Sequence, residues 1–269
     1  MKNLDFQNFS EFEAWIDEIK LEQSIRKKNQ PWLFSDLLFR GHASEKWPLL
    51  TTLEREHPDV NTIDEYLRIA ARIKLQVELH SGRKWGEIFD DQGQIVDVGD
   101  ISFGGTIPAL DYLVYLRHHG FPSPLLDWTR SPYIAALFAY SSCNSEEGRI
   151  AIFVYQQYSG KVKARYSEGG FLHNIGPYID THKRHSIQQA QYSLCLIKSK
   201  NLLNNDYTLY SHEDYRTNNP GDLYKITLPT SEKYKILAKF DQFNLNLHSL
   251  YGSEEALMST LALREFHFR

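Results

Sequence analysis

The stretch HGFPSPLLDWTRSPYIAALFAYSSC, residues 119–143, carries the clearest fold signals in the chain. Gly120 is placed to end a preceding helix, expected over about 108–118, in a left-handed cap. The run FPSPLLDWT then reads as a short buried strand. Ser131 is expected to cap the following helix, with Pro132 in its first turn, where proline is tolerated. The segment therefore predicts a helix, a strand and a second helix in succession.

Apolar periodicity and turn residues predict the other elements. Helices are expected over residues 4–29, 62–79, 231–240 and 252–265. Strands are expected over residues 32–41, 148–156, 192–197 and 223–228. Residues 83–106, rich in glycine and aspartate, read as an exposed insertion or hairpin. Because βα units do not alternate regularly, the pattern predicts an α+β fold, with residues 1–29 as an N-terminal helical extension and residues 30–269 as one domain.

Composition narrows the classes of function. The chain has 269 residues, of which 42% are hydrophobic and 24% charged, enough for a full core. It has no run of roughly 20 apolar residues and its N-terminus is unlike a signal peptide, so we expect a cytoplasmic protein without a membrane contact. The net charge of -4 argues against bulk electrostatic binding of nucleic acid, although a local basic groove stays open. Cys143 and Cys195 lie in apolar runs without metal-ligand spacing, so no zinc site is expected.

Two stretches resemble the FRG domain family, which is named for a Phe-Arg-Gly signature. The first runs from Phe39-Arg40-Gly41 through Trp47-Pro48-Leu49 to Thr51-Thr52-Leu53-Glu54-Arg55, whose last residue fits a late arginine of the family pattern. The second is the Leu-Leu-Asp-Trp-Thr stretch quoted above. The family usually has a threonine-arginine pair directly before it, where this chain has Ser123-Pro124. The role of that arginine is therefore absent or moved to another position. A third, weaker stretch is formed by Arg184, Gln188, Ala190 and Tyr192, and the resemblance covers roughly residues 30–260.

FRG domains in turn resemble the ADP-ribosyltransferase fold, in which an arginine, a Ser/Thr strand followed by a helix, and a late glutamate surround NAD. The resemblance implies a mixed or antiparallel β core of that type, with flanking helices and an N-terminal helix. It also implies an enzyme that uses NAD to modify RNA, DNA or protein. Such an enzyme would act as a toxin or anti-phage effector, which an antitoxin partner could restrain. A binding module that recognises a nucleotide or a nucleic-acid end without turnover is the alternative, and a regulatory scaffold is a third.

The site residues follow from that resemblance. It implies catalytic roles for Arg40, Thr129, Gln191 and Glu254, and NAD contacts from Arg40, Gly41, His42, Asp127, Trp128, Thr129, Tyr133 and Gln188. The guanidinium of Arg40 could hold a diphosphate through paired charge-assisted bonds, and Gly41 could let a phosphate approach the backbone. Alternatively, Arg40 pairs with Asp127 in a half-buried structural network. Thr129 and Ser131 could likewise do no more than cap the helix.

The catalytic carboxylate is the weakest part of the match. Breaking the nicotinamide bond builds positive charge on the ribose, which a carboxylate would stabilise. Residues 188–192 read QQAQY, where a transferase pattern would carry a glutamate. A glutamine cannot offset a full positive charge. Other candidates are Asp127, Glu168, Glu254 and Glu255.

Histidines and basic residues offer further possibilities. Five histidines flank the two best motifs, and one of them could act as a base: His118, His119, His173, His182 and His185. His118 and His119 point in different directions from a helix end, so one of this pair is expected to be structural. Basic side chains around the glutamine segment could recruit an acidic acceptor, or could form a solvated loop. They are Lys161, Lys163, Arg165, Lys183, Arg184 and His185. Gly104-Gly105 lacks flanking strand and helix signals and reads as a hinge.

Overall fold

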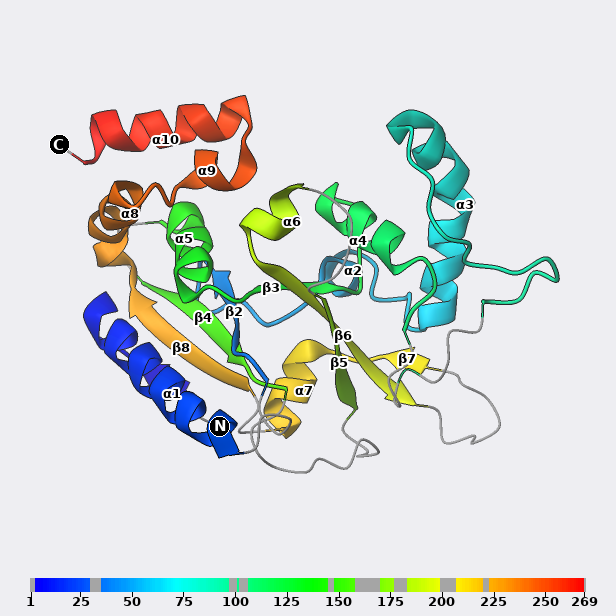
Figure 1. The fold of residues 1–269 in the computed structure, drawn as a ribbon, viewed down its shortest axis with the longest axis horizontal. Helices are drawn as coiled ribbons and strands as arrows, with labels where there is room; N and C mark the ends of the chain where they lie inside the picture. Colours follow the sequence, from blue (N-terminus) through cyan, green and yellow to red (C-terminus); the bar gives the residue numbers. More distant parts are fainter. Residues whose placement is uncertain are drawn as a thin grey trace.

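Within the described residues, eight strands form one mixed β-sheet at the centre of the molecule (Figure 1). The computed structural model describes residues 3–29, 35–96, 101, 106–144, 148–157, 170–176, 183–198, 207–219 and 223–268. The strands are β1 (Asn3–Asp5), β2 (Leu38–His42), β3 (Leu126–Thr129), β4 (Arg149–Tyr155), β5 (Phe171–Ile175), β6 (Ala190–Lys198), β7 (Tyr207–Leu209) and β8 (Leu223–Pro229). Their order is β1-β8-β4-β2-β3-β6-β5, with β7 pairing to β6. β1 is parallel to β8 and the other pairs are antiparallel, which confirms an α+β fold.

Helices surround the sheet (Figure 1). They are α1 (Phe9–Asn29), α2 (Thr52–Glu56), α3 (Ile63–Ser81), α4 (Leu110–His118), α5 (Pro132–Ser142), α6 (Lys183–Ile187), α7 (His212–Asn218), α8 (Lys233–Gln242), α9 (Leu247–Tyr251) and α10 (Glu254–Phe266). α1, α5 and α8 share one apolar cluster with β2, β4 and β8. α3 and α4 share another with β6. α10 lies away from the sheet, beside α9 (Figure 1). No helix in the described part of the chain combines the length and apolarity that a bilayer span requires.

The helix α5 follows the sequence expectation closely. The hydroxyl of Ser131 accepts a hydrogen bond from the backbone nitrogen of Ile134 at 3.3 Å, and Pro132 occupies the first turn. Gly120 has a φ of 83°, the left-handed conformation expected at the end of α4. The chain then returns through β3, so the 119–143 segment places a strand and a helix side by side. Helix α3 is also confirmed, with Thr62 as its N-cap and Gly82 after its last residue.

The N-terminus differs from the single helix expected over residues 4–29. β1 pairs with β8 first, and the helix begins at Phe9. Asn8 explains the start, because its side chain accepts from the backbone nitrogen of Glu11 at 3.0 Å while the Glu11 carboxylate accepts from the nitrogen of Gln7. Phe9 and Phe12 are buried in the cluster shared with α5 and α8. The first 29 residues therefore contribute both a strand and core side chains.

The segment expected to be an exposed insertion over 83–106 is partly core. Trp85 is buried, and its ring lies 5.1 Å from that of Tyr112 in α4. Ile88 is also buried, and Phe89 forms an isolated bridge with Ile95. The antiparallel bridge agrees with the hairpin alternative, whereas the expectation of exposure is wrong for Trp85 and Ile88. The proposed hinge at Gly104-Gly105 lies outside the described residues.

Candidate functional site

The sheet separates where β2 meets β3. Both strands are described in full, and Phe39 opposite Thr129 is their one paired position. Beyond it, β2 stays paired with β4, whereas β3 stays paired with β6. The two strands thus leave a gap. Arg40 from β2 bridges this gap, because its Nη1 donates to the main-chain oxygen of Asp127 at 2.9 Å.

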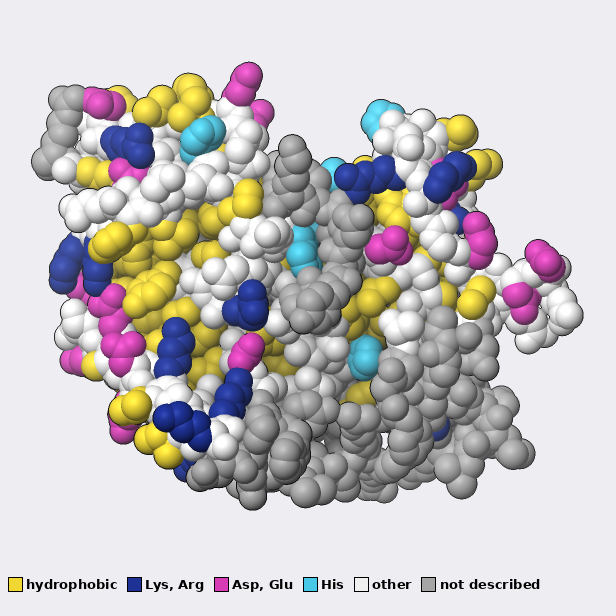
Figure 2. Space-filling view, viewed as in Figure 1, with side chains coloured by type: hydrophobic (Ala, Val, Ile, Leu, Met, Phe, Trp, Pro, Cys, Tyr) yellow, Lys and Arg dark blue, Asp and Glu magenta, His cyan; other side chains and the backbone are white. Residues whose placement is uncertain are grey.

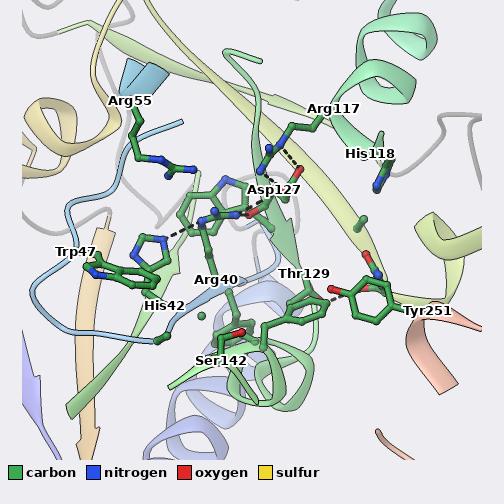
Figure 3. Close-up of a pocket in the computed structure, with 18 of the residues that line it drawn as sticks. Arg40, His42, Trp47, Arg55, Arg117, His118, Asp127, Thr129, Ser142 and Tyr251 are labelled. Atoms are coloured by element: carbon green, nitrogen blue, oxygen red, sulfur yellow. Dashed lines mark hydrogen bonds and ion pairs between the residues drawn. The ribbon is translucent and has the colours of Figure 1, made fainter. Parts of the chain in front are cut away.

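A cavity of about 770 Å³ opens at this gap (Figure 3). This volume lies within the range of roughly 300–1,000 Å³ that is typical of small-molecule sites. Its wall combines charged side chains with apolar and aromatic ones. The apolar part is formed by Phe39, Ala43, Trp47, Pro48, Trp128, Ala135, Phe138, Ala190 and Tyr251. The polar part is formed by Arg40, His42, Arg55, Arg117, His118, Asp127, Thr129, Ser142 and Gln188.

Positive charge dominates the described wall. The wall contains three arginines, Arg40, Arg55 and Arg117, and one carboxylate, that of Asp127, so three positive charges against one negative leave a formal charge of +2. Arg117 holds Asp127 through two bonds, Nε to Oδ1 at 3.2 Å and Nη2 to Oδ2 at 2.6 Å. Nη1 of Arg40 lies 3.7 Å from Oδ2 of the same carboxylate. The cavity is therefore suited to an anionic ligand.

Burial and mutual charge shift the pKa values of this cluster. The pKa of Arg40 is lowered to about 10, because burial and the charges of Arg117 and Arg55 together outweigh the opposing effect of Asp127. Arg40 still keeps its charge at neutral pH. Burial acts to raise the pKa of Asp127, but the charges and hydrogen bonds of Arg117 and Arg40 outweigh it and lower that pKa. The Asp127 charge in turn raises the pKa of Arg117.

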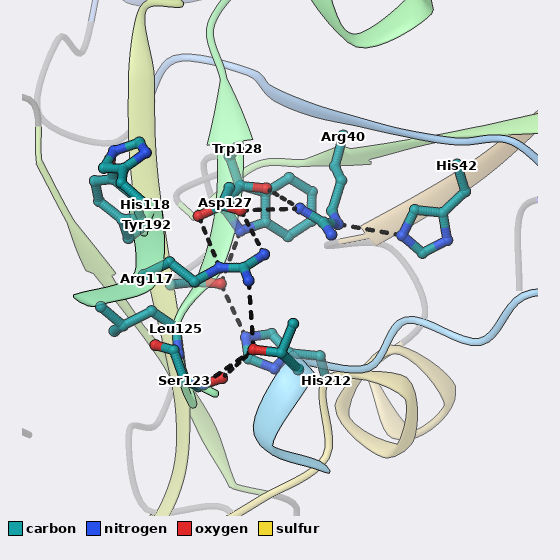
Figure 4. A network of polar contacts seen from close by, with 12 residues as sticks. Arg40, His42, Arg117, His118, Ser123, Leu125, Asp127, Trp128, Tyr192 and His212 are labelled. Carbon is teal, nitrogen blue, oxygen red and sulfur yellow. Dashed lines mark hydrogen bonds and ion pairs between the residues drawn. The ribbon is translucent and has the colours of Figure 1, made fainter. Parts of the chain in front are cut away.

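His42 completes the β2 side of the cavity as a neutral imidazole. Burial, followed by the charge of Arg40, lowers its pKa to about 3. Its Nε2 accepts a hydrogen bond from Nε of Arg40 at 3.2 Å, as Figure 4 shows. The indole of Trp47, 54% exposed, lies 6.3 Å from the imidazole. His42 thus orients the Arg40 guanidinium, while Trp47 presents an open ring at the rim.

On the β3 side of the cavity, Thr129 and Trp128 use their polar groups in hydrogen bonds within the protein. The hydroxyl of Thr129 donates to the carbonyl oxygen of Gln188 at 2.7 Å and accepts from the nitrogen of Ser131 at 3.1 Å. Trp128 is buried and its indole nitrogen donates to the hydroxyl of Ser193 at 2.7 Å (Figure 4). Both residues border the cavity, but their hydrogen-bonding groups already hold the sheet together.

Gly41 lines the cavity and also allows a close contact between β2 and α5. A Cβ at this position would lie 1.9 Å from the carbonyl oxygen of Ala135 and 3.0 Å from the Cβ of Ala139. β2 and α5 are therefore in direct backbone contact, which only glycine allows. The close approach of β2 to α5 sets the position of Arg40.

Three expected site residues lie outside the described wall of the cavity. The ring of Tyr133 packs 5.9 Å from Phe240 of α8, on the α1 side of the molecule. The side chain of Gln191 is buried and accepts from Asn174 Nδ2 at 3.2 Å. Glu254 is exposed in the first turn of α10. Glu255 is exposed beside it, and Glu168 lies outside the described residues.

Sequence reasoning missed the residues that complete the charged wall. Arg117 lies in the last turn of α4, and its Nη1 also contacts the hydroxyl of Thr52 at 3.3 Å. That hydroxyl accepts from the backbone nitrogen of Ser123, so the Arg117 guanidinium reaches the place where the chain lacks the usual threonine-arginine pair. Arg55 was visible in the first FRG stretch, but nothing local showed that it faces Arg40. Tyr251 enters from α9 (Figure 3).

The described residues give limited support to other kinds of site. They contain no cluster of three or more His, Cys, Asp or Glu side chains that could hold a metal ion. Cys143 and Cys195 are buried and free. The described part of the face in Figure 2 shows acidic and basic side chains interspersed, without a continuous basic band. His185 is buried against Tyr192, so it cannot recruit an acceptor at the surface, and Lys161, Lys163 and Arg165 lie outside the described residues.

Comparison with known proteins gave one match, to a family model that covers the strands on both sides of the gap. Searches of curated proteins and of solved structures found no match. Residues 35–148 match the family model described as FRG domain. The match includes β2, β3 and α5, and with them Arg40, Arg117 and Asp127. The match confirms the resemblance to the FRG domain family over residues 35–148, whereas its continuation to about residue 260 stays a prediction.

Proposed function

We propose that this protein binds NAD in the cavity between β2 and β3 and transfers its ADP-ribose to a macromolecular acceptor. The observation that carries the proposal is the grouping of Arg40, Arg55 and Arg117 in one wall of a cavity of about 770 Å³. Guanidinium groups bind diphosphates through paired charge-assisted bonds. The exposed ring of Trp47 and the ring of Tyr251 offer stacking surfaces for a planar base at the same cavity.

The order of the strands also supports kinship with ADP-ribosyltransferases. The resemblance places the arginine, the threonine strand and the glutamine segment around one ligand. These three parts are β2, β3 and the turn into β6, which are neighbours in the sheet. Arg40, Thr129 and Gln188 all line the cavity, although they are far apart in the sequence. A sheet that separates between β2 and β3 gives a ligand access to all three.

A binding module without turnover is the second candidate, and the state of Asp127 favours it. Asp127 is the carboxylate in the described wall, and two arginines already neutralise its charge. A carboxylate in that state gives less stabilisation to a developing positive charge on the ribose than an unpaired one would. Under this candidate the same arginines bind a nucleotide or the phosphorylated end of a nucleic acid.

Calorimetry with NAD, ADP and adenosine tests the binding proposal. We expect NAD and ADP to bind and adenosine to bind at least about tenfold more weakly, because it lacks the phosphates that the arginines contact. Arg40→Gln should weaken NAD binding by roughly 10- to 100-fold, the loss of one or two charge-assisted bonds. Arg26→Gln is the matched control, since Arg26 is exposed on α1 and pairs with Glu22. Equal binding by both variants would exclude this cavity as the nucleotide site.

Chromatography of nicotinamide separates the two candidates. Wild-type protein incubated with NAD and total cell RNA and protein should release nicotinamide and leave isotopic ADP-ribose on a macromolecule. Arg40→Gln should abolish the label while the circular dichroism spectrum stays native. NAD binding without nicotinamide release supports the binding module. If the transferase proposal holds, a role as a toxin or anti-phage effector, held in check by an antitoxin, is the setting that we propose.

A further inference from the structure

The three arginines of the cavity wall differ in how many of their donors the protein already uses. All three nitrogens of the Arg117 guanidinium donate, Nε and Nη2 to Asp127 and Nη1 to the hydroxyl of Thr52. Arg40 donates through Nε to His42 and through Nη1 to the main-chain oxygen of Asp127. Arg117 is therefore fully occupied, whereas Nη2 of Arg40 has no hydrogen-bond partner among the described residues.

Arg55 is the least occupied of the three arginines. It follows Glu54, which forms the capping box of α2 with Thr51, and its side chain is exposed. Its Nη1 donates to the carbonyl oxygen of Leu50 at 3.0 Å, and no carboxylate in the described part of the chain pairs with it. The edge of its guanidinium formed by Nε and Nη2 is therefore open. Such an edge can take two oxygens of one phosphate.

Arg55 and Arg40 reach the cavity from different elements, α2 and β2 (Figure 3). Burial is the larger effect on Arg40 and His42, but the charge of Arg55 also lowers the pKa of each, so the two guanidinium groups repel one another. The Asp127 carboxylate lies 2.6 Å from Arg117 and 3.7 Å from Arg40, which offsets the charge of those two. An anion between Arg40 and Arg55 would relieve the repulsion that is left.

Resting on the nucleotide binding proposed above, we propose that Arg55 is the specificity-determining residue of the cavity and makes it selective for a diphosphate. Arg40 binds one phosphate through Nη2, and Arg55 binds the neighbouring phosphate through its open edge. Arg117 keeps its donors on Asp127 and Thr52 and binds no phosphate. The class of ligand is thus a molecule with two adjacent phosphates, as in NAD or ADP, rather than a monophosphate.

The proposal requires the shape of the guanidinium as well as its charge. The planar fork of an arginine matches two oxygens of a phosphate, whereas the ammonium group of a lysine is a point charge without that geometry. A lysine at position 55 would keep the charge of the wall and lose the paired bonds. Arg55→Lys therefore separates recognition by the fork from general electrostatic attraction.

Calorimetry with inorganic pyrophosphate and inorganic phosphate compares anions of two phosphates and one, without a base. Wild-type protein should bind pyrophosphate at least about tenfold more tightly than phosphate. Arg55→Gln should reduce this preference to less than about threefold and weaken NAD binding by roughly 10- to 100-fold. Arg55→Lys should recover only a small part of both. Arg72→Gln is the matched control, because Arg72 is exposed on α3 and lies outside the described wall of the cavity.

The outcomes separate this inference from the function on which it rests. NAD binding by wild type, with an Arg55→Gln variant that keeps the preference for pyrophosphate, overturns the inference and leaves the proposed function in place. Full recovery in Arg55→Lys assigns the effect to charge alone and also overturns the inference. A wild-type protein that prefers pyrophosphate but binds no NAD supports the diphosphate site and removes the proposed function. Binding of none of these ligands removes both. Thermal unfolding of each variant identifies any loss that comes from misfolding.

Discussion

Nη1 of Arg40 donates to the main-chain oxygen of Asp127 at 2.9 Å, across the gap where β2 and β3 separate. The arginine thereby bridges two strands that no longer pair there. Its Nε is held by His42, and its charge lies 3.7 Å from the Asp127 carboxylate. The sequence allowed two hypotheses for Arg40, a structural network with Asp127 and a ligand-binding role. Arg40 belongs to a half-buried network with Asp127, and it also lines a cavity that could hold a ligand.

Asp127→Asn should destabilise the protein by about 1–3 kcal/mol at neutral pH, between the values typical of exposed and buried ion pairs. The pKa of Asp127 is lower in the folded protein than its usual value of 3.8. Its contribution is therefore present above about pH 4 and is lost as the pH falls through the folded pKa. Urea unfolding should show a difference in the free energy of unfolding between wild type and variant that becomes smaller below about pH 4. A difference that stays constant with pH would contradict an ionised pair.

Gly41→Ala should cost about 3 kcal/mol or more, because its Cβ would lie 1.9 Å from a backbone oxygen that cannot move aside without shifting α5. Chemical unfolding measures the loss. Gly86→Ala is the matched control, since a Cβ at Gly86 would have no neighbour within 4 Å. Equal stability of the two variants would mean that β2 and α5 do not touch as described.

Local signals predicted the elements better than they predicted the site. The caps at Ser131 and Gly120 are decided by a few neighbouring residues, and the structure confirms them. Short elements were missed, because β5, β7, α6, α7 and α9 have three to seven residues, too few for a period to show. In α9 the missed signal was a capping box at Asn246.

The cavity depends on pairing between distant segments, which local patterns do not encode. Gln191 directly follows Ala190, which lines the cavity, and the alternation of side chains along a strand turns Gln191 to the opposite face of the sheet. The Asp127 partner Arg117 lies ten residues earlier, at the end of a helix, where a basic residue has an ordinary explanation. Motif resemblance found Arg40 and Asp127, because it reflects the folded arrangement rather than the local sequence.

Phe12→Ala should lower the free energy of unfolding by about 3–5 kcal/mol, because Phe12 is fully buried between α1 and the core. Leu21→Ala on the same helix should change it by less than about 0.5 kcal/mol, since Leu21 is 62% exposed. Thermal and urea unfolding give both values. A chain that lacks residues 1–29 and keeps the wild-type melting temperature would show that the helix is an appendage after all.

His42 and His212 should make the protein acid-sensitive well above the range of its carboxylates. Burial, followed by the charge of Arg40, lowers the pKa of each to about 3 from the usual 6.5. Between about pH 3 and pH 6.5 the two histidines are protonated in the unfolded chain but neutral in the folded protein. The free energy of unfolding therefore falls as the pH falls from 6.5. The slope should approach 2.7 kcal/mol per pH unit, at about 1.4 for each histidine. Urea unfolding between about pH 4.5 and 6 measures this slope.

His212→Gln should remove roughly half of the slope even if it lowers stability at pH 7 by breaking the bond to Ser193. His57→Gln, at an exposed position, should leave the slope unchanged. A His212→Gln slope equal to that of wild type would show that this buried imidazole is protonated in the folded protein.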